Sequence, residues 1–137
     1  RFESYIKPMK LDMKKLIALF ALVLGFAFTS NAQGALKFKQ EKHDFGTTTE
    51  GTIATYSFEF TNTGKTPVVI SNVQPSCGCT TPDWTREPVM PGKTGKVTAS
   101  FNSAGRPGNF NKTVTVINNG EVSQIVLAIQ GSVAAKK

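Results

Sequence analysis

The sequence feature that most constrains the fold is a regular alternation of side chains between Ile53 and Thr61. Apolar and aromatic residues occupy every second position, and polar residues occupy the positions between them. The first set is Ala54, Tyr56, Phe58 and Phe60, and the second is Thr55, Ser57, Glu59 and Thr61. Because successive side chains of a strand point to opposite faces of a sheet, this segment is expected to be a β-strand with one buried and one solvated face. The buried face needs a second layer to cover it.

Short β-rich runs separated by turn residues occupy the rest of the chain. The expected runs are Leu36 to Phe45, which ends at Gly46, Val68 to Val73, Val97 to Phe101, Phe110 to Val116 and Val122 to Val133, with room for one more around Val89. Lys112 falls among the core-facing positions of its run, which indicates a strand edge or a bulge there. The pattern predicts an all-β fold, an immunoglobulin-like sandwich of two antiparallel sheets with about seven strands.

Three turns are specified by residue type. In Asn62-Thr63-Gly64-Lys65 the asparagine can cap its own backbone and the glycine accepts a positive φ. Pro91-Gly92 fits the two central positions of a type II turn. Asn119-Gly120 is a strong hairpin signal and is expected to join the last two strands.

The N-terminal region has the pattern of a secretory signal peptide. Met13-Lys14-Lys15 precedes a thirteen-residue apolar run, Leu16 to Phe28, and Ser30-Asn31-Ala32 places small residues before Gln33. We expect cleavage between Ala32 and Gln33. The alternative, a membrane anchor, is disfavoured because the run is shorter than the ~20 residues that cross a hydrocarbon core.

These features divide the chain into three parts. Residues 1–12 are expected to be an upstream or non-native extension, with Met9 as an alternative start to Met13, residues 13–32 the signal peptide, and residues 33–137 a single domain. The protein is therefore expected in the bacterial periplasm or outside the cell, with membrane contact only through an uncleaved signal peptide. Five of the 16 basic and two of the nine acidic residues precede Gln33, which leaves a net charge of +4. The remaining lysines are scattered, which argues against nucleic acid binding.

Both cysteines and the only tryptophan lie in one short stretch, whose residues of interest are Pro75, Ser76, Cys77, Gly78, Cys79, Thr80 and Trp84. In an oxidising compartment the two cysteines are expected to pair, and Gly78 permits a turn that brings their Cα atoms within disulfide range. Such a small ring stabilises a fold little. Three interpretations follow: a disulfide or thiol pair that shapes the loop, a redox couple, or two thiolates that bind Cu(I).

The sequence offers few side chains for a zinc site or for a catalytic dyad. Zinc usually takes four ligands, and His43 is the only histidine that could join the two thiols. A cysteine–histidine dyad would need His43 within reach, and we interpret this residue, beside Asp44, as a surface or capping residue. Trp84 is expected to pack into the core, with a lid over the cysteines as the alternative. Asp83 and Arg106 are interpreted as solvated charges in turns. We expect no catalytic residue and no cofactor.

Five short motifs occur together in this order along the chain: Phe45-Gly46, Phe58 to Gly64, Cys77-Gly78-Cys79-Thr80, Pro91-Gly92 and Phe101-Asn102. From about Phe38 to Gln130 the chain resembles the DUF1573 family of bacterial exported domains. The resemblance implies a seven- to eight-stranded immunoglobulin-like sandwich, similar to Hydin and major sperm protein type domains, which act as binding or scaffolding modules. It implies no enzymatic activity.

The leading functional hypothesis is an exported, non-catalytic interaction domain that presents the cysteine loop to a protein or cell-envelope component. The alternative is a thiol–disulfide redox or Cu(I)-handling protein that uses Cys77 and Cys79 directly.

Overall fold

The computed structural model describes residues 13–15, 17–18 and 33–137. The predictions for residues 1–12, for most of the apolar run and for Ala32 lie outside the described residues, and the signal peptide stays a prediction. None of the helical residues described belongs to a helix long and apolar enough to cross a membrane. Residues 33–137 lie in one compact unit.

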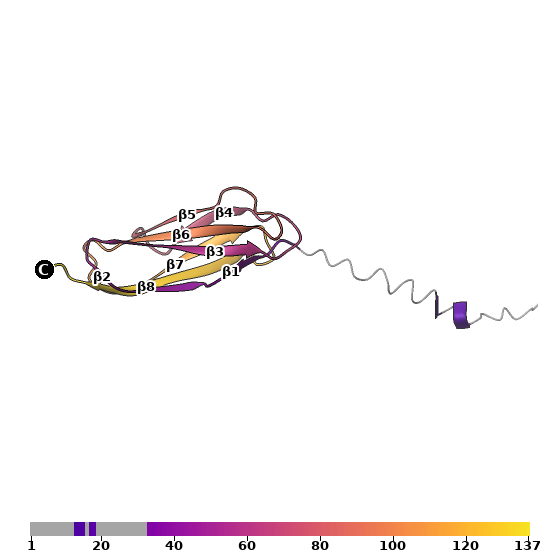
Figure 1. The fold of residues 1–137 in the computed structure, drawn as a ribbon, viewed down its shortest axis with the longest axis horizontal. Helices are drawn as coiled ribbons and strands as arrows, with labels where there is room; N and C mark the ends of the chain where they lie inside the picture. Colours follow the sequence, from indigo (N-terminus) through magenta and orange to yellow (C-terminus); the bar gives the residue numbers. More distant parts are fainter. Residues whose placement is uncertain (1–12, 16, 19–32) are drawn as a thin grey trace, which may run out of the picture. The chain divides into compact units, whose positions relative to one another are not determined.

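This unit is a sandwich of two four-stranded sheets (Figure 1). Its strands are β1 (Leu36–Phe38), β2 (Lys42–Thr49), β3 (Ile53–Asn62), β4 (Ile70–Pro75), β5 (Thr80–Trp84), β6 (Thr94–Asn102), β7 (Gly108–Asn118) and β8 (Gln124–Ala134). One sheet has the order β1-β3-β6-β5 and the other the order β2-β8-β7-β4. The predicted all-β, immunoglobulin-like sandwich is therefore confirmed, with eight strands in place of about seven.

The first predicted strand is two strands in different sheets. β1 pairs with β3 antiparallel, whereas β2 pairs with β8 parallel, so the second sheet is mixed rather than antiparallel. Gly46 was expected to end the strand, and instead it lies inside β2 at an irregularity between Asp44 and Thr47. Its φ of +68° is the left-handed conformation that glycine adopts without steric cost, so the strand bulges here and continues.

The core lies between the sheets and consists mainly of the alternating residues predicted from the sequence. The fully buried large side chains include Phe58, Phe60, Phe101, Leu127 and Ile129. On β3 the apolar positions face this core while Thr55 and Ser57 face outward and hydrogen-bond Ser100 and Thr98 of β6. The period-2 pattern of β3 thus fixed which of its faces is covered.

Two predicted strand positions are corrected by the structure. Val68 and Val89 form only an isolated bridge to each other, so the strand predicted at Val68 starts later, at Ile70, and no strand forms around Val89. The additional strand is instead β5, directly after the cysteines. Proline in the middle of β5 hid it from the sequence pattern, and it is compatible with the strand because β5 lies at a sheet edge.

Lys112 lies in β7 without a bulge, because β7 and β8 pair in continuous register. The β4 partner of β7 extends only as far as the pair Pro75–Val114, so Lys112 occupies a part of β7 that has β8 alone beside it. The prediction of an edge is correct in this local sense, and the bulge is not formed.

The Pro91-Gly92 turn forms as expected, and in the Asn62 turn the asparagine caps its own backbone as expected, but Gly64 does not have the positive φ that was predicted. The side-chain Oδ1 of Asn62 accepts the N–H of Gly64 (2.9 Å). Gly92 has a φ of +78°, and the N–H of Lys93 donates to the carbonyl of Met90 (3.0 Å), which closes the turn. Both turns carry a local hydrogen bond that residue type alone predicts.

The Asn119-Gly120 turn differs from the expectation. β7 ends at Asn118 and β8 begins at Gln124, so five residues connect the two strands. Gly120 has no positive φ, and the two-residue hairpin turn that Asn-Gly favours does not form. Asn118 organises a longer loop, since its Oδ1 accepts the N–H of Gly120 (2.7 Å) and its Nδ2 donates to the carbonyl of Val122 (3.0 Å).

Candidate functional site

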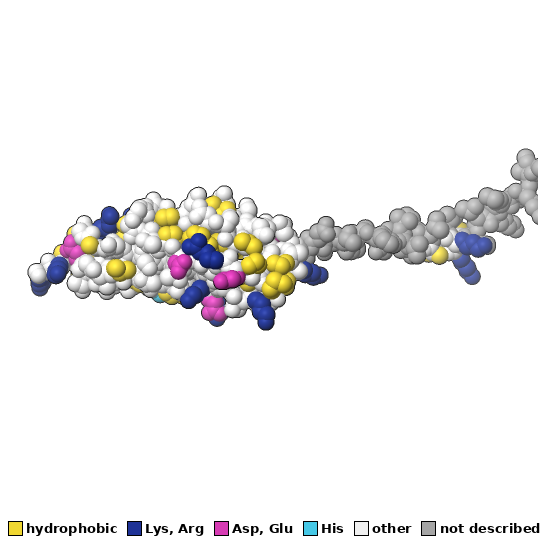
Figure 2. All heavy atoms as spheres, turned by 90° about the horizontal axis from the view of Figure 1, so that it is seen from above, with side chains coloured by type: hydrophobic (Ala, Val, Ile, Leu, Met, Phe, Trp, Pro, Cys, Tyr) yellow, Lys and Arg dark blue, Asp and Glu magenta, His cyan; other side chains and the backbone are white. Residues whose placement is uncertain are grey.

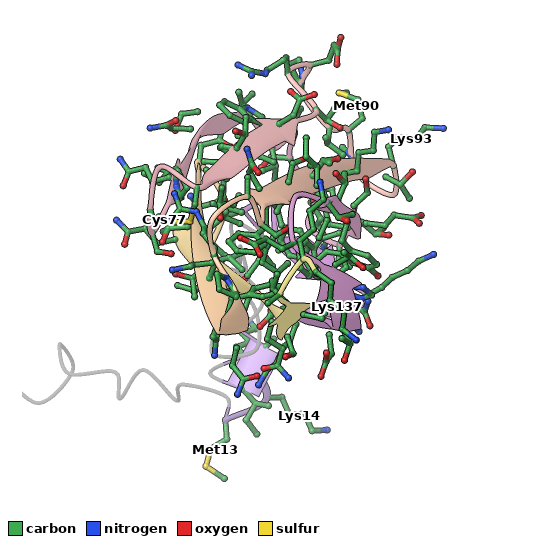
Figure 3. All side chains as sticks on the ribbon, turned by 90° about the vertical axis from the view of Figure 1, so that its left-hand side faces the viewer. Met13, Lys14, Cys77, Met90, Lys93 and Lys137 are labelled. Atoms are coloured by element: carbon green, nitrogen blue, oxygen red, sulfur yellow. A yellow bond between two sulfur atoms is a disulfide. The ribbon has the colours of Figure 1, made fainter. Side chains whose placement is uncertain are left out.

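The cysteine loop connects the two sheets at one edge of the sandwich. It follows β4, the last strand of one sheet, and leads into β5, the last strand of the other. Figure 3 shows Cys77 at the periphery of the domain, well away from the turn that contains Met90 and Lys93. The short Cys-Gly-Cys segment therefore marks the point where the chain crosses from one layer to the other.

The two cysteines have different environments. Cys79 is 6% exposed and belongs to the hydrophobic core, whereas Cys77 is half-buried and packs against that core from outside. Their Cα atoms are 5.3 Å apart, inside the ~4.4–6.8 Å range that a disulfide requires. The backbone N–H of Cys79 points at Sγ of Cys77 (3.2 Å), and Thr80 donates to the carbonyl of Cys77 (3.3 Å). The geometry permits the predicted pair and leaves Cys77 as the more accessible sulfur.

His43 and the cysteines lie at opposite edges of the sandwich. His43 is on β2, which is the first strand of its sheet, while β4 is the last strand of that sheet. The imidazole stacks on the ring of Tyr56, with centroids 3.7 Å apart. Within the described part of the chain, no group of three or more histidine, cysteine, aspartate or glutamate side chains is placed to hold a metal ion. The topology therefore separates His43 from the thiols.

Trp84 lies at the far end of β5 from the cysteines. It is five positions after Cys79, which corresponds to ~17 Å at the usual rise per residue of a strand. The indole is half-buried and packs against the core, in agreement with the interpretation as a packing residue. Its remaining face is covered by the guanidinium of Arg86, 3.5 Å from the ring centroid. The indole of Trp84 therefore covers part of the hydrophobic core and does not cover the sulfur atoms.

A hollow of about 380 Å³ opens beside this stack, lined by Asp83, Trp84, Thr85, Arg86, Glu87, Lys96 and Thr98. Asp83 lies in β5 rather than in a turn, and its carboxylate contacts Arg86 (3.6 Å). The Nε1 atom of Trp84 is buried and has no hydrogen-bond partner among the described residues. The hollow is therefore lined by an aromatic ring with a stacked cation and by two carboxylates.

Sequence reasoning did not identify Arg86. The signal was its position two residues after Trp84, since residues i and i+2 of an extended chain share a face. Arginine over a tryptophan face is a favourable cation–π arrangement.

The free edge of β5 carries no available backbone donor. The N–H of Thr85 donates to the carbonyl of Lys96, so the backbone of Thr85 points toward β6. In an antiparallel pair successive residues point alternately toward and away from the neighbouring strand. The residues of β5 whose backbone points away from β6 are therefore Thr80, Pro82 and Trp84. Proline has no N–H. Thr80 donates to Cys77 (3.3 Å), and Trp84 donates to Oδ1 of Asp83 (2.9 Å). An added strand would find no N–H here.

The free edge of β4 is closed in the same way. Ser76 donates to the carbonyl of Thr113, which directs the backbone of Pro75 and Val73 away from β7. Pro75 has no N–H, and the N–H of Val73 is bonded to Oδ1 of Asn72 (2.9 Å). Both strands that flank the cysteine loop thus combine a proline with an amide or carboxylate side chain that binds the next backbone N–H. This is a recognised means of preventing strand addition.

A second hollow, of about 420 Å³, lies over the sheet that contains β2, β8 and β7, lined by Asp44, Gly46, Thr47, Asn109, Phe110, Asn111, Gln130, Gly131 and Ser132. The carboxylate of Asp44 accepts the N–H of Gly46 (2.8 Å) and the amide of Gln130 (3.1 Å). The backbone bond to Gly46, the bond to Gln130 and the nearby charges of His43 and Lys42 lower the pKa of the Asp44 carboxyl below its ordinary value. Sequence reasoning missed this polar cluster because its members come from three strands.

Figure 2 looks onto the domain from above the view in Figure 1. Basic and acidic side chains are interspersed on this face, with small apolar areas between them. The surface is therefore of mixed charge where it is shown.

Residues 36–133 match the family described as "Protein of unknown function (DUF1573)". The chain belongs to the DUF1573 family. The match runs from the first residue of β1 to Val133 in β8 and includes the cysteine loop. No curated protein matches the sequence. Family membership thus confirms the resemblance read from the sequence and adds no activity to it.

Solved structures similar to this DUF1573 chain share its sandwich. A protein of unknown function from Porphyromonas gingivalis W83 matches with a TM-score of 0.66 and 16% identity over 77% of this chain and 50% of its own. The PapD-like domain 7 of human CEP192 matches with a TM-score of 0.58 and 14% identity over 74% of this chain and 87% of its own. The VesB protease of Vibrio cholerae matches with a TM-score of 0.59 and 15% identity over 71% of this chain and 31% of its own. The chain spans about half the length of the Porphyromonas protein, and at these identities the likeness shows the fold alone.

Proposed function

We propose that this DUF1573 chain is an exported, non-catalytic immunoglobulin-like domain that binds a protein or cell-envelope component through side chains at the Trp84 end of β5. The observation that supports this best is the stack of Arg86 on Trp84 beside an open hollow. Tryptophan and arginine are enriched among the residues that dominate binding energy at protein interfaces.

Contact through side chains is favoured over strand addition at this edge. The outward N–H groups of β5 are bonded internally or replaced by proline, as described above. A partner that approaches β5 therefore meets the rings and charges of the hollow. In the cysteine loop Cys79 is buried, whereas Pro75, Ser76 and Gly78 are exposed.

Site-specific photo-crosslinking in the native cell tests this proposal. A benzophenone amino acid is placed at position 86, at position 78 in the cysteine loop, and at position 65, where an exposed lysine lies on the turn after β3, a strand that β6 separates from β5. We expect one discrete adduct from position 86, which Trp84→Ala or Asp83→Ala should weaken when introduced beside the crosslinker.

Equal adducts from positions 86 and 65 would show non-specific collision and would contradict the proposal. A discrete adduct from position 78 alone would move the contact to the cysteine loop. Thermal unfolding of each variant serves as the folding control, because Trp84 also packs against the core.

A second candidate function, thiol–disulfide exchange or Cu(I) handling, has one favourable observation. The N–H of Cys79 donates to Sγ of Cys77, which would stabilise negative charge on the more accessible sulfur. In exchange, a partner dithiol would become a disulfide while this pair takes up two electrons and two protons to become two thiols. The structure supplies no neighbouring base or third ligand from the described residues.

Thiol alkylation with mass spectrometry decides this second candidate. Protein taken from its native compartment is alkylated before and after mild reductant, and with added Cu(I). A bond that resists mild reduction, together with no retained copper, would end the redox and copper interpretations. Free thiols that retain one copper per chain would support the copper-handling interpretation over the interaction proposal.

A further inference from the structure

The edge of β2 differs from the closed edges beside the cysteine loop. β2 is the first strand of its sheet and has β8 on one side only. It lies on the side of the sandwich opposite β4 and β5 (Figure 1). It contains no proline, and it is long enough, from Lys42 to Thr49, to pair with another strand.

The hydrogen bonds to β8 show which backbone groups of β2 face outward. Ala128 donates to the carbonyl of Glu41 (2.8 Å), and Lys42 is opposite Ala128 in the parallel register. In a parallel pair the backbone groups of alternate residues point to the same neighbour. Glu41 and His43 therefore bond β8, while Lys42 and Asp44 direct both N–H and C=O away from it. No acceptor for these two N–H groups occurs among the residues that the structure describes.

The other strands at sheet edges offer much less. β4 and β5 have lost their outward donors to proline and to side-chain bonds. β1 is only three residues long. The segment of β2 before its bulge is therefore the best open site for strand pairing in the described domain.

The side chains on this segment are complementary to a second copy of themselves. Lys42 and Asp44 are both exposed, carry opposite charges and lie on the same, outer side of the strand. Between them, His43 turns its ring inward onto Tyr56. When two antiparallel copies are centred on His43, each Lys42 lies directly opposite the partner's Asp44. These residues also carry the outward N–H and C=O groups, as a hydrogen-bonded antiparallel pair requires.

We propose that two copies of this chain pair their β2 strands antiparallel about a two-fold axis at His43, so that two four-stranded sheets become one sheet of eight strands. Four backbone hydrogen bonds and two Lys42–Asp44 pairs form across the axis. Registers shifted by one pair are disfavoured, because centring on Lys42 or on Asp44 places like charges opposite each other. The bulge at Gly46 bends the strand and limits the pairing to this segment.

Sedimentation equilibrium of protein produced from the full-length sequence tests this dimer. The wild type should show a monomer–dimer equilibrium. Lys42→Asp and Asp44→Lys should each weaken the dimer by about tenfold or more, because each places two like-charged pairs across the axis. The double variant Lys42→Asp/Asp44→Lys should recover most of the affinity that the single changes remove, since the pairs re-form with exchanged signs, and less than the whole of it, since a lysine at position 44 cannot accept the N–H of Gly46.

Lys42→Pro tests the backbone component separately. It removes an N–H that points away from β8, so the edge strand should tolerate it and keep its thermal unfolding temperature, while the dimer is lost. Matched charge changes at exposed positions outside β2, Lys65→Asp and Glu121→Lys, should leave the equilibrium unchanged.

A wild type that stays monomeric at all concentrations would overturn the proposal. So would a dimer that survives Lys42→Pro, or a double charge exchange that fails to recover most of what the single changes remove. If Lys42→Pro does not fold, the charge-exchange series still decides the question.

Discussion

Asn62 should be a major source of stability, although it is polar and sits at the end of a strand. It is 0% exposed. Its Oδ1 accepts the N–H groups of Ala35 (3.2 Å) and Gly64 (2.9 Å), and its Nδ2 donates to the carbonyls of Thr66 and Val89 (2.8 Å each). One side chain thus joins the N-terminal segment, the turn after β3 and the segment before β6.

Replacing this residue with alanine removes all four bonds. The carbonyl of Val89 keeps a bond from Val68 (3.0 Å), so it is not left unpaired. The N–H groups of Ala35 and Gly64 lose their acceptor, and an unpaired buried donor costs ~1–3 kcal/mol. Both sites are partly buried, so the lower part of this range applies, and the two lost donations add ~0.5–1.5 kcal/mol each. Asn62→Ala should lower the free energy of unfolding by about 3–5 kcal/mol.

Urea unfolding followed by circular dichroism measures this loss. The matched control is Asn111→Ala, because Asn111 is an exposed asparagine on β7 and should tolerate the change within about 0.5 kcal/mol. A loss below about 1 kcal/mol for Asn62→Ala, or one equal to that of Asn111→Ala, would refute the reasoning. It would mean that water replaces the amide and that the four bonds carry little net energy.

Three further predictions concern a charge, a glycine and the cysteine pair. The pKa of Asp44 is lowered in the folded state, so at acidic pH, below about pH 4, the folded state binds fewer protons than the unfolded state. The stability that the charge of Asp44 contributes should therefore be present above that pH and be lost as the pH falls through the folded pKa. Urea unfolding of wild type and Asp44→Asn across this range should show the two curves converging in acid; a constant difference would assign the effect to something other than the charge. Gly95→Ala should destabilise the fold by about 1–3 kcal/mol, because its new Cβ would lie 2.5 Å from the ring of Phe60, whereas Gly78→Ala meets no atom within 4 Å and should be tolerated in the same unfolding assay. Equal losses at the two glycines would contradict the packing argument. Reduction of the cysteine pair by a phosphine should cost less than about 2 kcal/mol in calorimetry, since the closed ring is so short, and a much larger loss would show that the pair holds the crossover between the sheets.

Much of the fold follows from local patterns that the structure retains. The alternation on β3 specifies a buried face, and the buried residues of β6 and β8 repeat it. The division of the first predicted strand into β1 and β2 was not predictable in this way, because both segments alternate and only the tertiary pairing shows that they join different sheets. Gly46 illustrates the ambiguity, since a positive φ serves either to end a strand or to bulge it.

The candidate sites were less predictable than the fold for the same reason. The cysteine loop is visible as a motif, yet the burial of Cys79 depends on the crossing between sheets. The stack of Arg86 on Trp84 was accessible from spacing, whereas the contact between Asp44 and Gln130 joins residues 86 positions apart. A single sequence gives no means of placing two such distant residues in one cluster.

The closed edges beside the cysteine loop determine how far any assembly of this chain can grow. A sheet that is open at both edges can recruit copies indefinitely and form a fibre. Here the sheet of β2, β8, β7 and β4 is open at β2 and closed at β4 by Pro75 and Asn72. Pairing through β2 uses the open edge of both copies and leaves closed edges outward. Strand addition in this sheet therefore stops at two chains, which protects the β-sandwich from polymerisation.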